Sequence, residues 1–381
     1  MSSSLPLQRT IAKTLSQRLP NQRKTRRRAL AEMIAGLHRA QHVHLSRIAD
    51  YIPGRAQLDS KTRRMRRFLD NDAVDPHRYY APVRQLLIQA AAQSNGRIRL
   101  LLDTLELSGN RQILMAALAY RRRALPIQWQ VRRRTGVSSA DQQISLLRAL
   151  AGQMPDHADV IVVGDGAFHS TDLMDYITGQ GWHFRLRLHA DTYVRKGKGE
   201  GKGEGKGEGK GKGEGQSTSA GEEWKQLQDY APEKGERRYL QDVYVTQDQT
   251  YGPVSIALYH KETEDDPWLI CTDQEADYLT LRTYSRRMWI EQLFGDFEDG
   301  GFHLNRSRIY NPARLSRLVM ALSWVYVWLM HVGAWVVKRG LRPMVDRSDR
   351  RDRSYVEIGR RWLRRCMLNG TPLRIGLKPY F

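Results

Sequence analysis

The run Ile98-Arg-Leu-Leu-Leu-Asp103 marks the point where this 381-residue chain changes from helical to strand-like texture. A continuous apolar stretch bounded by polar residues is typical of a strand that is buried on both faces. Two further strands are predicted at Gln112–Ala119 and Ala124–Val131, joined by the arginines 121–123. The run therefore opens a sheet, and we expect the Asp103 carboxylate to stand at the end of its first strand.

The residues that follow alternate between helix and strand patterns. Helical spacing is present at 141–150, and a second apolar strand at 159–163 ends at Gly164-Asp165-Gly166. A helix at 171–179 then precedes a strand at 182–188. Three strands, helix, strand, helix, strand is the order of a ribonuclease-H-like layer. The predicted fold class is therefore α/β, with a ribonuclease-H-like catalytic core.

An all-helical basic domain is predicted before this core, at residues 1–95. Helices are expected at 26–39, 61–69 and 82–92, and no strand pattern interrupts them. A basic helical module of this kind could bind DNA, but it carries no convincing helix-turn-helix signature. The sequence therefore predicts a DNA-binding domain without specifying how it docks.

A low-complexity segment divides the rest of the chain. Residues 196–215 alternate glycine with lysine and glutamate, so they lack the apolar surface that would offset the entropy of ordering. Strand-like texture resumes afterwards, which predicts an insertion at 193–276 made of this flexible linker and a β-rich unit. The predicted core then occupies 96–192 and 277–340, followed by a basic C-terminal segment at 341–381.

The charge of the chain is concentrated at its two ends. The formal net charge is +21, with 18 Lys/Arg against 6 Asp/Glu in residues 1–95 and 13 against 4 in residues 338–381. A neutral middle between basic flanks suits a polyanion that the ends hold and the centre processes. Nucleic acid is the leading partner, and a generic basic protein is the alternative.

The compartment is predicted from two weak signals. Cys271 and Cys366 lie far apart with no metal-binding spacing, and no apolar stretch follows the charged N-terminal residues. We therefore expect a protein of the reducing cytosol. The apolar stretch Leu318–Val337 is long enough to span a bilayer, but it stands alone and contains Ser323 and His331. A buried core helix is favoured over a membrane span, so no membrane partner is expected.

A helix with one polar face is predicted from Tyr284 onward. At about 100° per residue, Tyr284, Arg287, Glu291 and Glu298 fall on one side, with apolar residues on the other. An ordinary surface helix with a solvated polar stripe would explain this pattern alone. Two upstream aspartates, Asp103 and Asp165, favour a functional interpretation.

Three carboxylates are expected to converge. Asp103 and Asp165 each end a predicted strand, and Glu291 lies on the later helix. Buried carboxylates are costly unless they are paired, so a natural use for them is to hold a hard cation. Three of them could bind two divalent ions about 3.5–4 Å apart, one activating a water or a 3′-hydroxyl. Each aspartate alone could instead be a helix cap or a turn residue.

The segments Leu-Leu-Leu-Asp103-Thr, Val-Val-Gly-Asp165-Gly and Tyr284-x2-Arg287-x3-Glu291 resemble the three blocks of DDE transposases of the IS4 superfamily. The resemblance covers roughly residues 96–340. It implies that Asp103, Asp165 and Glu291 are the catalytic, metal-binding triad for two Mg²⁺ ions, with Mn²⁺ as a substitute. It also implies that Tyr284 and Arg287 bind the phosphates of the transposon ends.

The resemblance implies an insertion-sequence transposase that hydrolyses phosphodiester bonds at element ends and transfers the 3′-hydroxyls into target DNA. Its implied partners are the double-stranded terminal inverted repeats and target DNA, held by a homodimer in a synaptic complex. A hairpin intermediate and a cytoplasmic location beside the bacterial nucleoid are implied as well. A catalytically impaired DNA-binding relic and a two-metal nuclease are the alternatives.

One position departs from the family pattern. After Glu291 and six further residues the family expects lysine, whereas this chain has Glu298. The change replaces a phosphate-binding cation with an anion, which should weaken DNA contact near the site. Arg306 and Arg308, which follow the motif helix, are candidates for compensation.

Overall fold

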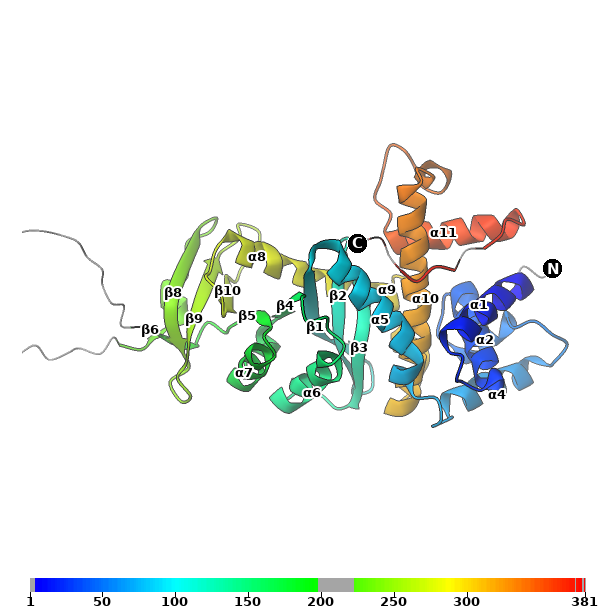
Figure 1. Cartoon of the computed structure of the whole chain (residues 1–381), viewed down its shortest axis with the longest axis horizontal. Helices are drawn as coiled ribbons and strands as arrows, with labels where there is room; N and C mark the ends of the chain where they lie inside the picture. The colour runs from blue at the N-terminus through cyan, green and yellow to red at the C-terminus, as the bar shows by residue number, and fades with distance from the viewer. Residues whose placement is uncertain (1–3, 198–222, 374, 379, 381) are drawn as a thin grey trace, which may run out of the picture. The chain divides into compact units, whose positions relative to one another are not determined.

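The chain folds into two compact units. The computed structural model describes residues 4–197, 223–373, 375–378 and 380. The first unit comprises Met1–Val160 and Arg286–Phe381, and the second comprises Ile161–Ser285. Figure 1 shows the N-terminal helices, in blue, beside the C-terminal helices, in orange and red. The first unit is therefore assembled from both ends of the chain.

Five helices precede the first strand, which confirms the prediction of a helical N-terminal region. Each of the three predicted helices lies within one of them. The best-defined start is that of the fifth helix, where the Asp75 carboxylate accepts hydrogen bonds from the backbone N–H groups of His77 and Arg78, at 2.8 and 3.0 Å. The helices are α1 (Ser4–Arg18), α2 (Lys24–Ala40), α3 (Leu45–Asp50), α4 (Leu58–Leu69) and α5 (Pro76–Asn95).

A three-stranded antiparallel sheet follows, formed by β1 (Arg97–Leu107), β2 (Arg111–Tyr120) and β3 (Arg123–Arg133). Its three predicted strands are confirmed, but the position of Asp103 is not. Asp103 pairs with Met115 in the middle of the β1–β2 ladder, which continues to Leu107 opposite Arg111. The expectation that Asp103 ends its strand is wrong, because the antiparallel pairing extends four residues beyond it.

The long helix α10 (Pro312–Lys338) forms the core of the first unit. It is apolar and long enough to cross a membrane, yet 89% of its most apolar window is buried within the protein. It packs against β3, α2, α5 and α11 (Tyr355–Leu368). The Trp129 indole N–H of β3 donates to the Ser316 hydroxyl at 3.0 Å. The predicted buried-core helix is therefore confirmed.

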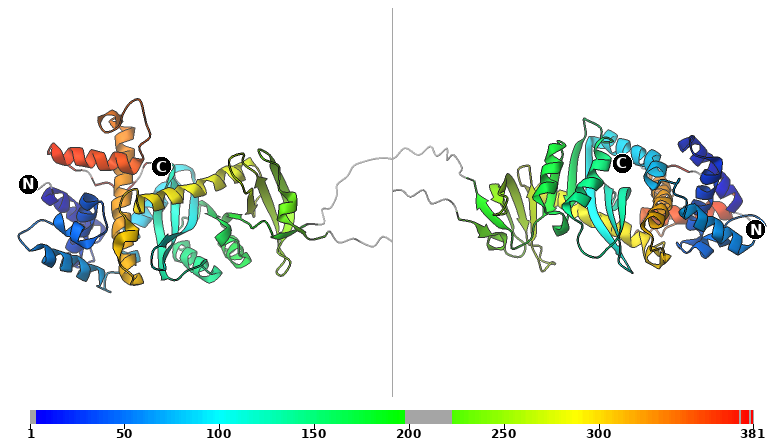
Figure 2. Two further views of the ribbon diagram at one scale, coloured as in Figure 1. Left: turned by 180° about the vertical axis from the view of Figure 1, so that it is seen from behind. Right: turned by 90° about the horizontal axis from the view of Figure 1, so that it is seen from below.

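Two glycines allow α10 and α11 to approach closely. A Cβ atom at Gly333 would lie 1.9 Å from the carbonyl oxygen of Tyr355, and one at Gly359 would lie 2.1 Å from that of Leu329. No side chain fits at either distance, so the two backbones are in contact there. The left view of Figure 2 shows α11, in red, lying against α10, in orange. This contact fixes α11 on the core helix.

The second unit holds most of the remaining strands. Its strand order is β4-β5-β10-β9-β8-β6-β7, with β4 and β5 parallel and the other recorded pairs antiparallel. The strand-like texture predicted after the linker is thus confirmed. The predicted linker at 196–215 lies outside the described residues beyond Gly197. The strands are β4 (Asp159–Gly164), β5 (His183–Arg187), β6 (Tyr193–Lys196), β7 (Lys225–Gln226), β8 (Arg237–Val245), β9 (Tyr251–Tyr259) and β10 (Trp268–Thr272).

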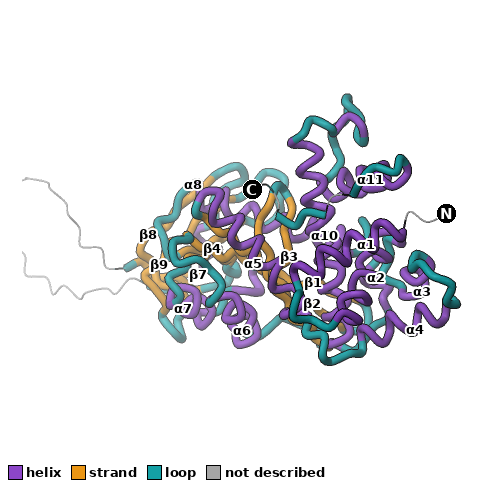
Figure 3. The backbone as a smooth tube through the Cα atoms, turned by 45° about the vertical axis from the view of Figure 1, so that its right-hand side comes forward, coloured by secondary structure: helices purple, strands orange, loops and turns teal. Residues whose placement is uncertain are grey.

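The remaining elements are short helices. Figure 3 shows the helices in purple and the strands in orange. In the first unit α6 packs on β3 and β2, whereas in the second unit α7 packs on β5. The fold is mixed α/β, compatible with a ribonuclease-H-like core. The remaining α-helices are α6 (Ala140–Ala151), α7 (Thr171–Gly179), α8 (Tyr278–Tyr284) and α9 (Met288–Phe297), and the 3-10 turns are η1 (Gly166–Phe168), η2 (Leu227–Tyr230), η3 (Ser285–Arg287), η4 (Leu304–Ser307) and η5 (Arg342–Met344).

Candidate active site

Asp103 lies on β1 with most of its side chain buried. Its carboxyl group is 14% exposed, and Oδ1 accepts a hydrogen bond from the Thr104 backbone N–H at 2.7 Å. The other oxygen, Oδ2, faces the guanidinium of Arg287 at 3.3 Å. A carboxylate in so little solvent needs such a cation, because burying an unpaired charge is costly. The first predicted metal ligand is therefore held by a neighbouring positive charge.

The same guanidinium reaches a second predicted ligand. Arg287 donates through its other terminal nitrogen to Oε1 of Glu291, at 2.7 Å, and its side chain is 15% exposed. Glu291 lies in the first turn of α9, where the helix dipole favours a negative charge, and it is 40% exposed. Arg287 thus bridges Asp103 and Glu291. Three of the predicted site residues meet here, although Asp103 lies 184 positions before Arg287 in the chain.

Helix α9 is fixed in this position by an interaction that sequence reasoning missed. Arg123, at the start of β3, donates to Oδ2 of Asp296 at 3.1 Å and to the side-chain oxygen of Gln292 at 3.1 Å. Burial raises the pKa of Asp296, and the Arg123 charge opposes that rise. The interaction ties α9 to the sheet that carries Asp103. Its only sequence signal is the helical spacing of Gln292 and Asp296.

The chemistry of the site follows from its donor set. Carboxylate oxygens are the ligands that Mg²⁺ and Ca²⁺ prefer, and the shared guanidinium shows that this pair of side chains binds a positive charge. Asp103 and Glu291 therefore fit a divalent cation that takes the place of Arg287. Within each unit, the described residues include no group of three or more His, Cys, Asp or Glu side chains placed to hold a metal.

Asp165 lies in the second unit, directly after β4, where the sequence predicted it. Its Oδ1 accepts a hydrogen bond from the Ala167 backbone N–H at 3.0 Å, so it caps the 3-10 turn η1. The rings of His169 and His189 both reach the Gly166 carbonyl oxygen, at 2.6 and 2.9 Å. His169 follows the turn as its C-terminal cap.

Tyr284 is the last residue of α8 and is buried in the second unit. Its ring is 2% exposed and packs edge-on against Trp268, with 5.0 Å between the centroids. The Trp268 indole N–H donates to Glu264 at 2.6 Å, and the Lys261 ammonium lies 3.6 Å from a Trp268 ring centroid. Trp268 is therefore a packing residue.

The single motif helix predicted from Tyr284 to Glu298 is wrong. Helix α8 ends at Tyr284, the turn η3 follows, and α9 begins at Met288. The Ser285 hydroxyl donates to the Arg282 carbonyl oxygen at 2.8 Å, a local bond of the kind that competes with regular helix. Glu298 then caps the C-terminus of α9. Burial raises the pKa of the Glu298 carboxyl, with a smaller contribution from Asp299.

Arg306 and Arg308 are exposed in and after the turn η4. No hydrogen bond or ion pair is recorded for either guanidinium within the described part of the chain. Arg308 adopts a left-handed backbone conformation, with φ of 54°, and lines a cleft of about 470 Å³. Two arginines that sequence reasoning did not select, Arg66 and Arg314, line the same cleft. The two arginines expected to compensate for Glu298 therefore lie at the surface.

A family model described as "Transposase DDE domain" matches residues 111–328, more than half of the chain. The chain belongs to this family. The matched range contains Asp165, Arg287 and Glu291 and begins eight residues after Asp103. Transposases of this family act on DNA and generally use divalent metal ions. No curated protein matches this transposase.

Proposed function

We propose that this transposase is encoded by an insertion sequence of the IS4 superfamily. It would cut phosphodiester bonds at the element ends and join the freed 3′-hydroxyls to target DNA, in cut-and-paste transposition. One observation carries the proposal: Asp103 and Glu291 share the guanidinium of Arg287, at 3.3 and 2.7 Å. Two carboxylates from separate elements that share one cation are a natural site for a divalent metal ion.

Asp103, Asp165 and Glu291 would together hold two Mg²⁺ ions, for which Mn²⁺ could substitute. Such ions activate the attacking oxygen and stabilise the charge that develops on the phosphate. Asp103 is held by β1 and Glu291 by α9, so little reorganisation of their backbones is needed. With a metal ion on the two carboxylates, the Arg287 guanidinium would bind a DNA phosphate, for which its planar fork is suited.

The proposed substrates are the double-stranded terminal inverted repeats and a target duplex. By analogy with the superfamily, two copies of the chain would bring two ends together in a synaptic complex and form hairpin ends. The positive charge of the chain supports an anionic partner. We also propose a cytoplasmic location beside the nucleoid, because the proposed partner is DNA.

The test is cleavage of a labelled DNA end by the full chain in the presence of Mg²⁺ or Mn²⁺. Asp103→Asn and Glu291→Gln should each lower the cleavage rate by at least a hundredfold, since removing a charged ligand disables metal binding. The matched control is Glu106→Gln, because Glu106 lies three residues along β1 and bonds to Gln112 instead, at 2.9 Å. It should leave cleavage within about twofold of the wild type.

Two other outcomes would redirect the proposal. DNA binding without nicking by the wild-type chain would indicate an impaired relic. Nicking without transfer of a pre-cut end into a plasmid would indicate a two-metal nuclease. Equal cleavage by the wild type and by both carboxylate variants would show that Asp103 and Glu291 are not metal ligands.

A further inference from the structure

The two basic ends of the chain meet at one surface of the first unit. Helix α2, from the N-terminal region, and helix α11, from the C-terminal segment, both line a cleft of about 770 Å³. Both helices pack on the core helix α10, which lies between them in the chain. We call this cleft the arginine cleft. It is lined by His38, Arg39, Gln41, Tyr51, Met344, Val345, Glu357, Arg360, Arg361, Arg364, Arg365, Met367, Leu368 and Asn369.

Two direct contacts join the walls of the arginine cleft. A terminal guanidinium nitrogen of Arg360, on α11, donates to the side-chain oxygen of Gln41, the residue that caps α2. Arg39, on α2, lies 3.4 Å from the Met367 sulfur on α11 and 5.3 Å from the centroid of the Tyr51 ring. The cleft is therefore a built feature of the folded unit, because Arg39 and Arg360 each contact the opposite wall.

The lining is strongly positive. It includes five arginines, with Glu357 as its acidic residue. Glu357 is already engaged by Arg361, at 2.6 Å, and by Arg360. Burial lowers the pKa of His38 to about 3, with smaller contributions from Arg39 and Arg360, so this ring is neutral at pH 7. The surplus charge therefore belongs to the arginines.

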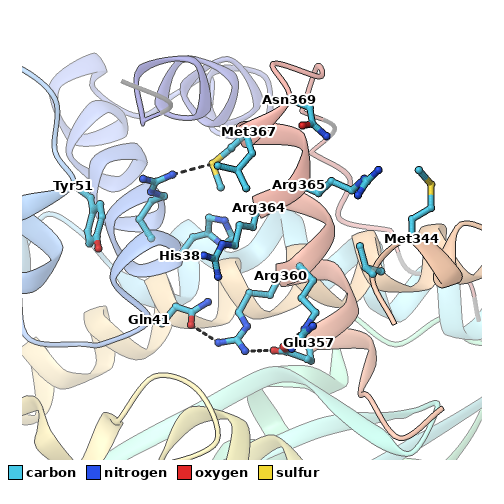
Figure 4. A pocket seen from close by; sticks show the side chains of 14 residues that line it. His38, Gln41, Tyr51, Met344, Glu357, Arg360, Arg364, Arg365, Met367 and Asn369 are labelled. Carbon is cyan, nitrogen blue, oxygen red and sulfur yellow. Dashed lines mark hydrogen bonds and ion pairs between the residues drawn. The ribbon is translucent and has the colours of Figure 1, made fainter. Parts of the chain in front are cut away.

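Two of these arginines are available for an external anion. Arg364 and Arg365 are exposed, and the structure records no hydrogen bond or ion pair for either guanidinium among the described residues. Arg360 and Arg364 are four residues apart and so repeat along one face of α11 with a rise of about 6 Å. In Figure 4 these two extend toward α2, whereas Arg365 extends on the other side of α11 toward Met344.

This arrangement suits an extended anion better than a small one. Sites for small ligands are mostly apolar and enclosed, with a few polar groups that converge on one point. Here the guanidinium groups are spread over more than one helical turn, and those of Arg364 and Arg365 lie at the surface. Successive phosphates of a nucleic-acid backbone present charge at repeated intervals, so Arg364 on one side of α11 and Arg365 on the other can each meet a different phosphate.

We propose that the arginine cleft binds the phosphate backbone of duplex DNA, with Arg364 and Arg365 as contacts outside the cleavage site. The choice of duplex DNA as the partner rests on the proposed function. Because the contacts are to phosphates, they hold the protein on DNA of any sequence and do not select a base sequence. The C-terminal segment then contributes to DNA binding together with the N-terminal helices.

The test measures binding in EDTA, where cleavage does not contribute. Fluorescence anisotropy of the full chain with a labelled duplex of arbitrary sequence is recorded across a series of salt concentrations. The double variant Arg364→Ala/Arg365→Ala should reduce the slope of log K against log salt by about 2, since each lost phosphate contact removes about 0.9. At 150 mM salt its dissociation constant should rise roughly tenfold.

The matched control is Arg133→Ala/Arg134→Ala. These two arginines are also adjacent and exposed in the first unit, lie outside the arginine cleft, and have no recorded side-chain partner among the described residues. Both variants lose two positive charges, so a general effect of net charge would appear equally in both. Thermal unfolding is measured in parallel, and both melting temperatures should stay within about 2 °C of the wild type.

The cleft is supported if the Arg364/Arg365 variant loses slope and affinity while the control keeps both. Equal losses in the two variants, or no loss in either, would overturn the proposal. Loss of binding to phosphatidylserine vesicles with an unchanged slope on DNA would identify a lipid-binding surface, which also overturns it. A failure of the proposed cleavage activity would leave these binding results intact, so the two conclusions are tested separately.

Discussion

Replacing Arg287 with glutamine tests whether the guanidinium holds the two carboxylates in place of a metal ion. The change removes a positive charge that lies 3.3 Å from Asp103 and 2.7 Å from Glu291. Removing one partner of a fully buried ion pair costs about 3–5 kcal/mol. Glu291 is 40% exposed, so solvent screens part of the loss, and we expect about 2 kcal/mol.

The loss should be visible as a lower melting temperature in EDTA. For a unit of this size, about 2 kcal/mol corresponds to a fall of roughly 4 °C, measured by differential scanning calorimetry. A divalent cation should reverse the loss, because it can neutralise both carboxylates without first displacing Arg287. The variant should bind the metal ion roughly thirtyfold more tightly, because the ion no longer has to displace an interaction of about 2 kcal/mol and each factor of ten is about 1.4 kcal/mol. Titration of the melting temperature with Mn²⁺ measures this difference.

Arg282→Gln is the control, because Arg282 is an exposed arginine on α8, five positions before Arg287. It should melt like the wild type with and without Mn²⁺. The reasoning is refuted if Arg287→Gln is as stable as the wild type in EDTA. It is also refuted if Mn²⁺ raises the melting temperature of both chains equally, since the guanidinium would then not compete for the carboxylates.

Three further predictions concern other parts of the first unit. Glu298→Lys should steepen the salt dependence of DNA binding by about 1; an unchanged slope and unchanged end cleavage would mean that Arg306 or Arg308 already supply the cation. His38→Phe should remove a pH dependence: the buried ring has a pKa of about 3, so between pH 6 and 4 the unfolded chain binds a proton that the folded chain does not. As the pH falls, the wild type should then lose about 1.4 kcal/mol of unfolding free energy per pH unit relative to the variant. Urea unfolding at pH 6 and pH 5 measures this, and an equal change in both proteins would contradict it. Gly359→Ala should cost about 3 kcal/mol or more, because its Cβ would lie 2.1 Å from the Leu329 carbonyl oxygen; Gly295→Ala, which has open space around its Cβ, is the control and should not destabilise.

The elements of the fold were largely predictable because their signals are local. The apolar runs of β1 to β3 and the buried face of α10 follow from the spacing of residues that must leave water. The end of β1 was not predictable, since the pairing of Leu107 with Arg111 depends on the turn between the strands. The 3-10 turn after Tyr284 also escaped prediction, because the apolar and polar periodicity continues through Ser285–Arg287 without a Gly or Pro to mark the change.

The candidate site was predictable as a set of residues but not as an arrangement. Asp103, Arg287 and Glu291 were all selected from the sequence, yet nothing in it showed that Arg287 would bridge the other two. The Arg123–Asp296 pair was missed, because its partners lie 173 positions apart and carry no motif. The arginine cleft was missed for the same reason: composition shows two basic ends, whereas only the packing of α2 and α11 on α10 brings them to one surface.

The core position of α10 also determines when the sheet can finish folding during synthesis. The sheet formed by β1 to β3 is complete at Arg133, but α10, which packs against β3, begins 179 residues later. At about 5–20 residues per second, a ribosome needs roughly 10–35 s to make the intervening chain. During that time Trp129 and the apolar surface around it lack their final cover. A chain that terminates before Pro312 would therefore carry an uncovered, aggregation-prone sheet and would not be a smaller working domain.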